Sequence, residues 1–405
     1  MNWIQFGRLI HSIYSHNGKL PDLDWIQSLG LLAVKLGQVH ALRSDFLEPE
    51  KCEHLSKLFR NNHAMGSEDF LQLVESTAVS DFISHFETIE PDALASASVG
   101  QVHLGTLKDG TRVVIKAVKK DVRKDFIADV SSVRRLFGFI SFFYRKLKRV
   151  GNPEAILNDI EEYTLSELDL RKEVDGVRVL ASIRDKNKDQ YDFSKLSFAK
   201  VHESICNENV MVSDFIPGPS LDELLDQGKL DYDTLLELFK IHGYYMFCAG
   251  TFHGDLHPGN VLVDESQENF YFIDTGYIGH VGPKIRKGLF YFFKALTENN
   301  FTEAANSLSE MAEVPLTGED MKKFQSDLIN LYKDFPGKSV SEISLTRQMM
   351  ETIKLGVQTG MAFDQGIFAI VRSLMYLDGM VLRCNPDAVL MDDIKPFIDG
   401  FDRFI

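Results

Sequence analysis

The sequence lacks most features of secreted and metal-stapled proteins. Its four cysteines lie far apart, and none forms a C-x-x-C pair: Cys52, Cys206, Cys248 and Cys384. A disulfide scaffold and a zinc site are therefore poor interpretations, and the thiols are expected to be small buried apolar groups in a reducing compartment. The N-terminal segment has neither a continuous apolar core nor a small-residue cleavage site, so no secretory signal is expected.

The sequence also lacks an apolar run of the roughly 18 residues that a membrane-spanning helix needs. The nearest candidate, LFGFISFFY at 136–144, is too short and precedes the basic run RKLKR. An apolar patch beside a basic one is typical of interfacial helices, so peripheral membrane contact of a cytoplasmic protein is one prediction. The patch comprises Phe137, Phe139, Phe142, Phe143 and Tyr144, followed by Arg145, Lys146, Lys148 and Arg149. The alternative is a buried helix whose basic end lies in water.

Positive charge is scarce. The chain has 44 Lys and Arg against 59 Asp and Glu, which gives a formal net charge of −15. A broad acidic field repels a phosphate backbone, so nucleic acid is not expected as a partner. A nucleotide pocket is still compatible with this charge, because magnesium carries part of it. The 30 phenylalanines supply material for a large core.

The order of predicted elements favours an α+β protein with two lobes. Helical periodicity extends to about residue 81, and strands are predicted at 98–107 and 112–118 around the turn at 108–110, as in a hairpin. Two more strands are expected near 197–201 and 209–215 before the break Ile-Pro-Gly-Pro. Helices then dominate, at 232–249 and 283–405, with a short hairpin between them at 261–273.

The strongest chemical signal is FHGDLHPGN at 252–260. Asp255 and Asn260 are five residues apart, which is the spacing in the kinase catalytic loop H-R-D-L-x-x-x-N. In that loop a carboxylate reaches the acceptor hydroxyl, and an amide one loop-turn later holds a metal. Asp255 is therefore the catalytic candidate and Asn260 a candidate metal ligand.

Two further motifs follow the kinase order. Asp274 ends a predicted strand 14 residues after Asn260, in the position of the D-F-G aspartate, with Thr275 in place of the phenylalanine. Lys116 lies in the apolar strand VVIKAV, where a lysine needs a counter-charge or a phosphate. Alone, an Asp-x-Gly is usually a turn and a strand lysine usually points to water. Together and in this order, the motifs predict a kinase fold that binds magnesium with ATP or ADP.

With these residues in place, the sequence resembles the UbiB/AarF family of atypical kinase-like proteins from about residue 31 to 386. The resemblance is carried by K-x-G-Q (Lys35, Gln38), by an alanine-rich loop (Ala95, Ser96, Ala97, Ser98) and by E-x-D (Glu167, Asp169). It implies a bilobal protein-kinase-like fold. Residues 1–85 would form an N-terminal helical extension, 86–216 an N-lobe with a helical insertion, and 217–405 a mainly helical C-lobe.

The resemblance also implies roles for these residues. Glu173 would pair with Lys116 as the helix-C glutamate, and Glu167 would meet Lys35, with Glu167, Asp169 and Glu173 on one predicted helix. Gln38 would point toward the nucleotide phosphates. The alanine-rich loop would replace the glycine-rich loop and bias nucleotide choice, although Ser96 stands where the family usually has alanine.

The acceptor is the least specified part. After Gly276 the chain returns to a helix with no A-P-E motif and no long activation segment, so a small or lipid-like acceptor, or water, fits better than a peptide. The resemblance implies an atypical kinase or ATPase that supports ubiquinone or other isoprenoid-lipid metabolism. Two alternatives stay open: a small-molecule phosphotransferase of the aminoglycoside or choline kinase type, and a non-catalytic, nucleotide-gated scaffold for lipid or protein.

Overall fold

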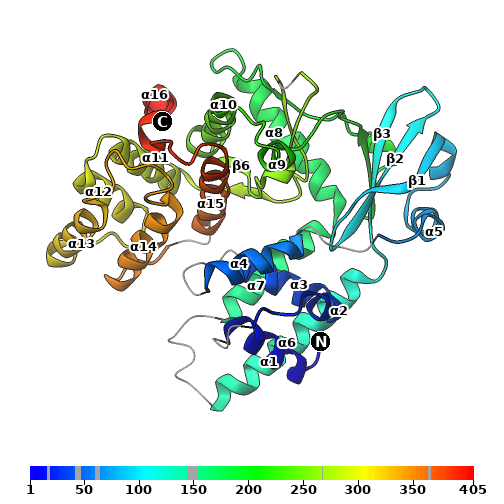
Figure 1. Cartoon of the computed structure of the whole chain (residues 1–405), viewed down its shortest axis with the longest axis horizontal. Coiled ribbons are helices and arrows are strands. Elements are labelled where there is room, and N and C mark those ends of the chain that lie inside the picture. The colour runs from blue at the N-terminus through cyan, green and yellow to red at the C-terminus, as the bar shows by residue number, and fades with distance from the viewer. Residues whose placement is uncertain (16–18, 42–46, 60–63, 144–152, 267, 364–365) are drawn as a thin grey trace. The chain divides into compact units, whose positions relative to one another are not determined.

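The chain divides into two compact units (Figure 1). A computed structural model describes residues 1–15, 19–41, 47–59, 64–143, 153–266, 268–363 and 366–405. Unit 1 comprises residues 1–174 and 200–215, and unit 2 comprises 175–199 and 216–405. Strands and helices both contribute, and most of the strands of unit 1 precede the helices of unit 2, which confirms the predicted α+β class.

In the sequence of unit 1, helices precede the sheet strands and also separate the third strand from the last. The central one, α3 (Leu31–Ala41), is buried along most of its length and contacts α2, α4 and α6. At its middle, a Cβ on Gly37 would lie 2.4 Å from the end of the Leu58 side chain, so a larger residue here would require Leu58 to move. The other helical elements of unit 1 are α1 (Trp3–Tyr14), α2 (Leu23–Ser28), α4 (Pro49–Ser56), η1 (Lys57–Phe59), α5 (Ser67–Thr77), η2 (Phe82–His85), α6 (Val122–Phe143), α7 (Pro153–Glu167) and η4 (Glu203–Ile205).

Unit 1 contains a four-stranded antiparallel sheet in the order β1-β2-β3-β5. Its strands are β1 (Phe86–Ser96), β2 (Gly100–Leu107), β3 (Arg112–Val118) and β5 (Val210–Asp214). The predicted β2–β3 hairpin is confirmed, but β1 was not predicted. It is an edge strand with three register shifts and an internal Pro91, so it lacks the alternation that marks a strand in sequence. Ala95 and Ser96, expected in a loop, are therefore strand residues, and the turn is only 97–99.

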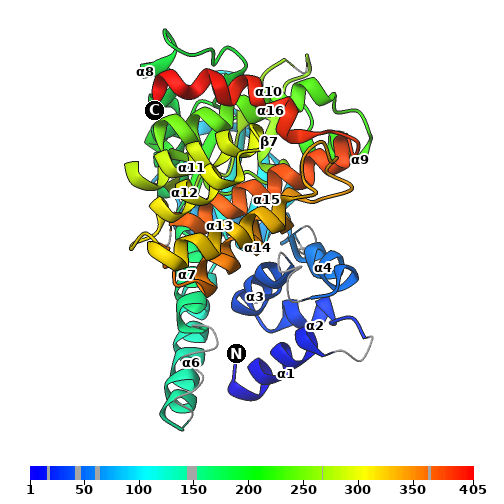
Figure 2. The ribbon, with the colours of Figure 1, turned by 90° about the vertical axis from the view of Figure 1, so that its left-hand side faces the viewer.

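Unit 2 is mainly helical. The helix α8 (Leu170–Asn187) begins in unit 1 and continues into unit 2. The remaining helical elements are α9 (Leu221–Asp226), α10 (Tyr232–Gly243), the π-helical turn η5 (Tyr244–Ala249), η6 (Pro258–Asn260), α11 (Pro283–Thr297), α12 (Phe301–Met311), α13 (Gly318–Tyr332), α14 (Leu345–Gln358), α15 (Gly366–Cys384), α16 (Leu390–Phe401) and η7 (Asp402–Phe404). Successive helices from α11 to α15 pack on one another (Figure 2).

Short strands in unit 2 flank the loops that contain the predicted residues Asp255, Asn260 and Asp274. The sheet β4-β8-β7 is formed by β4 (Leu196–Ser197), β7 (Val261–Val263) and β8 (Phe270–Phe272), so the predicted β7–β8 hairpin is confirmed. A second pair, β6 (Thr251–His253) with β9 (Ile278–His280), was not predicted because each strand has only three residues. The expected helix at 232–249 is α10 followed by η5, which ends at Gly250 in the left-handed conformation.

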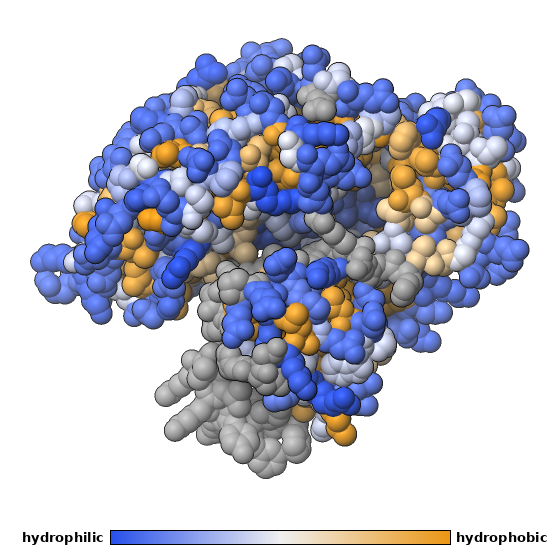
Figure 3. Space-filling model, in the orientation of Figure 1, coloured by the Kyte–Doolittle hydropathy of each residue, from blue (hydrophilic) through white to orange (hydrophobic). Residues whose placement is uncertain are grey.

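Unit 1 has two clusters of buried apolar residues, and unit 2 has one large core. In unit 2 it includes fully buried rings such as Phe252, Phe290 and Phe292, while the visible face of the molecule is mainly hydrophilic (Figure 3). No helix in the described parts of the chain is long and apolar enough to cross a membrane. Of the proposed membrane patch, residues 144–149 lie outside the described residues. Phe137 packs edge-on against Phe6, with ring centroids 5.7 Å apart, so this member lies against the helices of unit 1.

Candidate nucleotide and metal site

Lys116 projects from β3, an inner strand of the unit 1 sheet. Its neighbours Ile115 and Ala117 are buried on one face, so the strand pleat places Lys116 on the opposite face. There its Nζ donates to Glu173 Oε2 at 2.6 Å, across 57 residues of sequence. The side chains are 20% and 9% exposed, respectively, so the pair is largely removed from water. The predicted Lys116–Glu173 contact is confirmed.

The E-x-D motif lies at a junction between two helices rather than on one. Helix α7 ends at Glu167 and α8 begins at Leu170, so the expectation of a single helix carrying Glu167, Asp169 and Glu173 is wrong. Asp169 accepts from Nε and Nη2 of Arg171, at 2.8 and 2.7 Å, and from its backbone N–H. The Arg171 hydrogen bonds hold the pKa of Asp169 below its usual value, and the short polar side chain starts α8 as a cap does.

A second buried ion pair joins the N-terminal helices to α7. Lys35, on α3, pairs with Glu167, and its ammonium group lies 5.0 Å from the centroid of the Tyr163 ring. The predicted Lys35–Glu167 contact is therefore confirmed. Gln38 has a partner that the sequence did not suggest, because its amide donates to the Leu58 carbonyl at 3.1 Å. The orientation of Gln38 toward phosphates stays a prediction.

The alanine-rich turn is closed by a lysine that sequence reasoning missed. The Ala97 N–H donates to the Gly100 carbonyl at 2.9 Å, and Lys119 Nζ donates to the Ala97 carbonyl at 2.9 Å and to Ser96 Oγ at 3.3 Å. Burial lowers the pKa of Lys119. In the sequence, Lys119 directly follows the apolar run VVIKAV of β3, and this was the only indication that it lies near the site. Only the tertiary fold brings Lys119 to the turn.

In unit 2, His253 connects the predicted catalytic loop to the end of strand β8, which precedes Asp274. Its Nε2 donates to the Ile273 carbonyl at 2.9 Å, and its Nδ1 accepts from the Asp255 backbone N–H at 3.2 Å. One neutral tautomer makes both bonds, and burial lowers the pKa of His253, which favours that neutral form. His253 is thus a positioning residue for both Asp255 and Asp274, although the motif had pointed to it only as part of the loop.

The orientation of the Asn260 amide is set by the same loop. Its Nδ2 donates to the backbone carbonyl of Asp255 at 3.0 Å. The backbone carbonyl of Asn260 accepts from the Ile273 N–H at 3.0 Å. Because the amide nitrogen is committed to the backbone, the oxygen Oδ1 is the end directed away from that bond. An amide oxygen is a suitable ligand for a hard cation.

Asp274 occupies a constrained turn directly after β8. Its φ is +53°, in the left-handed region that few residues other than glycine adopt. The turn is also closely packed, because a Cβ on Gly176 of α8 would lie 2.0 Å from the Thr275 carbonyl oxygen. The backbone that carries the Asp274 carboxylate is therefore held in one conformation.

The donor set of this loop fits magnesium. Asp274 and Asp255 offer carboxylate oxygens and Asn260 an amide oxygen, and Mg²⁺ prefers oxygen ligands, often one or two carboxylates with phosphates and water completing the octahedron. Within the described ranges, no group of three or more His, Cys, Asp or Glu residues is placed to hold a metal ion.

Comparison with known proteins identifies the family of the chain. The ABC1 atypical kinase-like domain matches residues 57–308. A protein of Histophilus somni named "Probable protein kinase UbiB" is 26% identical over 386 residues, which cover 93% of this chain and 70% of that protein. A Vibrio cholerae protein of the same name is 26% identical over 383 residues, with 92% and 69% covered.

A solved structure supports the fold. The complex of Rv3197 with erythromycin from Mycobacterium tuberculosis superimposes with a TM-score of 0.51 at 16% identity, covering 90% of each chain. At this identity the likeness concerns the fold alone. Since the domain match spans more than half of the residues, the chain belongs to the ABC1 atypical kinase-like family, which is the family of the UbiB proteins, and has a protein-kinase-like α+β fold.

Proposed function

We propose that this chain is an atypical kinase or ATPase that binds magnesium with ATP or ADP. The observation that carries the proposal is the Lys116–Glu173 ion pair at 2.6 Å. In kinases, a strand lysine must be paired with a helix glutamate before it can orient the nucleotide phosphates. Here the pair forms between a central strand and the first turn of a helix, where a carboxylate is also favoured by the helix dipole.

The residues of unit 2 would carry the chemical step. Asn260 and Asp274 would hold Mg²⁺, which neutralises charge on the phosphates when bound. Asp255 would accept the proton of the acceptor hydroxyl, or of water, as that oxygen bonds to the γ-phosphorus. The bond to the β–γ bridging oxygen breaks, and ADP leaves with that oxygen. His253 would keep Asp255 in place through its backbone N–H.

The alanine-rich turn would set nucleotide preference. Lys119 draws the Ala97 carbonyl and the Ser96 hydroxyl toward its ammonium group, which narrows the conformations open to the turn. A stiffer turn with methyl side chains approaches phosphates less freely than a glycine-rich one. The preference between ATP and ADP would therefore depend on residues 95–98 as a group.

The segment after Gly276 limits the class of phosphoryl acceptor, because a strand of three residues there leads directly into α11. Without a long segment on which a peptide could dock, a small or lipid-like molecule, including an isoprenoid-related one, or water fits best. We place the protein in a supporting role in ubiquinone or other isoprenoid-lipid metabolism, with peripheral membrane contact. The Lys35–Glu167 pair would keep α3 in place as a fixed cover that excludes peptides.

Nucleotide binding and turnover are tested by calorimetry and phosphate release, with Mg²⁺ and ATP or ADP, with and without anionic vesicles. Asp255→Asn should bind nucleotide like the wild type but lose phosphate release, because it keeps the fold and removes the proton acceptor. Asp109→Asn, in the exposed β2–β3 turn, is the matched control and should change neither. Binding without turnover in the wild type would favour the scaffold alternative, and no magnesium-dependent binding would refute the proposal.

A further inference from the structure

The predicted catalytic segment of unit 2 has neither lysine nor arginine in its sequence. Residues 251–283 contain five acidic side chains, Asp255 and Asp274 among them. The kinase loop H-R-D-L-x-x-x-N has an arginine directly before its aspartate, whereas this chain has Gly254 before Asp255. A phosphate that approached this segment would meet carboxylates, so a cation beyond Mg²⁺ has to come from another element.

The space that an arginine side chain would need at position 254 is occupied by a tyrosine ring. A Cβ on Gly254 would lie 2.4 Å from the Tyr277 ring, and the Gly254 N–H donates to the Tyr277 carbonyl at 2.9 Å. Tyr277 is the third residue after Asp274 and leads into β9. Its ring therefore lies against the backbone directly before Asp255.

Helix α15 brings an arginine to this ring. The central carbon of the Arg372 guanidinium group lies 5.3 Å from the centroid of the Tyr277 ring, which is within the range of a cation–π contact. One helical turn further on, the Tyr376 ring meets the His257 ring edge-on, with centroids 5.4 Å apart. His257 belongs to the predicted catalytic loop and accepts from the Gly259 N–H at 3.1 Å. Since residues four apart share a helix face, one face of α15 lies along this loop.

We propose that Arg372 forms a phosphate subsite beside Asp255, in place of the arginine that the kinase motif carries within the loop. Its ligand is a terminal phosphate group, either the γ-phosphate of ATP or a phosphate monoester on the acceptor. A guanidinium group can donate to two phosphate oxygens at once, and contact with the Tyr277 ring limits its rotamers before the ligand binds. Arg372 is half-buried, so a solute can reach it while water screens its charge only in part. The inference rests on the proposed function, because it assigns the phosphate to the reaction around Asp255.

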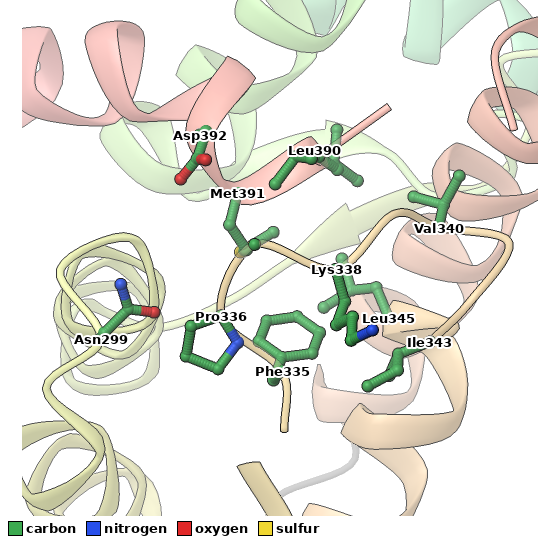
Figure 4. Close-up of a pocket in the computed structure, with 12 residues that line it drawn as sticks. Asn299, Phe335, Pro336, Lys338, Val340, Ile343, Leu345, Leu390, Met391 and Asp392 are labelled. Atoms are coloured by element: carbon green, nitrogen blue, oxygen red, sulfur yellow. The ribbon is translucent and has the colours of Figure 1, made fainter. Parts of the chain in front are cut away.

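The hollow between the α13–α14 connection and the start of α16 offers no comparable phosphate site (Figure 4). Phe335 and Leu390 give it apolar walls. Lys338 also lines it, but its ammonium group donates to Glu342 Oε1 at 2.6 Å, and Asp392 adds a carboxylate to the lining. An anion there would lose water and meet negative charge, which is unfavourable.

The first test measures, by calorimetry on the full chain, the affinities for ATP and for ADP with Mg²⁺. If the subsite holds the γ-phosphate, Arg372→Met should bind ATP about tenfold more weakly than the wild type and ADP equally well. Arg372→Lys should lie in between, because lysine keeps the charge but lacks the planar fork. Arg383→Gln is the matched control on α15 and should behave like the wild type, since Arg383 donates to Asp222 and Asp226 on α9.

The second test asks whether the phosphate belongs to the acceptor. Its probes are glycerol 3-phosphate, which is a phosphate monoester, and glycerol, both titrated in the presence of Mg²⁺ and ADP. In this case the wild type should bind glycerol 3-phosphate but not glycerol, and Arg372→Met should bind it about tenfold more weakly. If Arg372→Met changes neither the ratio of ATP to ADP affinity nor the binding of glycerol 3-phosphate, the subsite is overturned, and Arg372 only covers Tyr277.

A failure of the proposed function gives a different result. If the wild type binds neither nucleotide with Mg²⁺, the proposed function fails, and arginine labelling by phenylglyoxal then tests the subsite alone. Inorganic phosphate should slow the labelling of Arg372 in the folded wild type but not that of Arg383, as read by mass spectrometry of the peptides. Equal labelling of Arg372 with and without phosphate overturns the subsite. The same measurement decides if Arg372→Met does not fold.

Discussion

The residues proposed for nucleotide binding are held by different forces in unit 1 and in unit 2. In unit 1 the functional side chains are held by charge pairs between residues far apart in sequence, as Lys116 and Glu173 are across 57 residues. In unit 2 they are held by neutral hydrogen bonds to nearby backbone groups, as Asn260 is to Asp255 across five residues. Removing one partner of a charge pair leaves the other charge buried and uncompensated, which lowers stability. A hydrogen bond to a backbone group is not lost when neighbouring side chains change. Substitutions in the two units should therefore fail in different ways.

The largest effect is expected from Asp274→Asn, in unit 2. The amide has no negative charge to bind Mg²⁺, while asparagine tolerates the left-handed conformation at this position. Magnesium-dependent nucleotide binding should be lost with little change in the unfolding temperature, as read by thermal-shift titration. Saturable stabilisation at wild-type nucleotide and magnesium concentrations would remove Asp274 from the metal site.

In unit 1, Glu173→Ala should reduce stability as well as nucleotide affinity. Leaving Lys116 without its partner in a largely buried site is expected to cost about 3 kcal/mol. Urea unfolding of this variant, beside Glu173→Gln as the isosteric control that keeps one hydrogen-bond acceptor, measures the loss. An unchanged free energy of unfolding would mean that the two units do not differ in the way described.

The Lys35–Glu167 pair allows the same comparison away from the proposed phosphates. A double-mutant cycle with Lys35→Met, which keeps the apolar stem against Tyr163, and Glu167→Gln should give a coupling of about 2 kcal/mol in the free energy of unfolding. Nucleotide affinity measured on the folded variants then separates a cover that acts on the site from a purely structural one. A coupling near zero would show that charge pairing does not hold α3.

Acid should weaken unit 2 through its neutral buried histidines. His242 has a native pKa of about 3, far below the value near 6.5 of an unfolded chain, so only the unfolded state gains its proton as pH falls from 7.5 to 5.5. The stability contributed by the neutral ring is present above pH 6.5 and is lost progressively below it, by about 1.4 kcal/mol at pH 5.5. His242→Leu should remove this part of the pH dependence in urea unfolding, and an unchanged dependence would contradict the assignment.

The smallest effect is expected from Ser96→Ala, which restores the residue that the family usually has. It removes a weak hydrogen bond from Lys119 but leaves the bond from Lys119 to the Ala97 carbonyl. We expect a change of about 0.5 kcal/mol, or roughly twofold, in the ratio of ATP to ADP affinity. Lys119→Met should shift that ratio further, because it removes both bonds, and equal ratios in the two variants would exclude Lys119 as the residue that sets the turn.

The catalytic loop was predictable because its chemistry is local. Asp255, Asn260 and Asp274 lie within one loop and one hairpin, so their spacing in sequence already limits their separation in space. The same locality made the β2–β3 and β7–β8 hairpins and the C-terminal helices predictable. Prediction from local patterns failed for β1, where Pro91 and the register shifts remove the alternating pattern. It also failed for the break between α7 and α8, where Asp169 starts a new helix.

By itself, the sequence determined the α+β class and located the loop for which we propose a catalytic role, because periodicity and short-range spacing are properties of neighbouring residues. Only the tertiary structure decided which side chains meet across long separations: Lys119 with the alanine-rich turn, Gln38 with the Leu58 carbonyl, and Arg372 with the Tyr277 ring. Those contacts depend on how helices and strands pack, and packing is decided by many contacts between residues that are far apart in the sequence. A local sequence pattern does not contain that information.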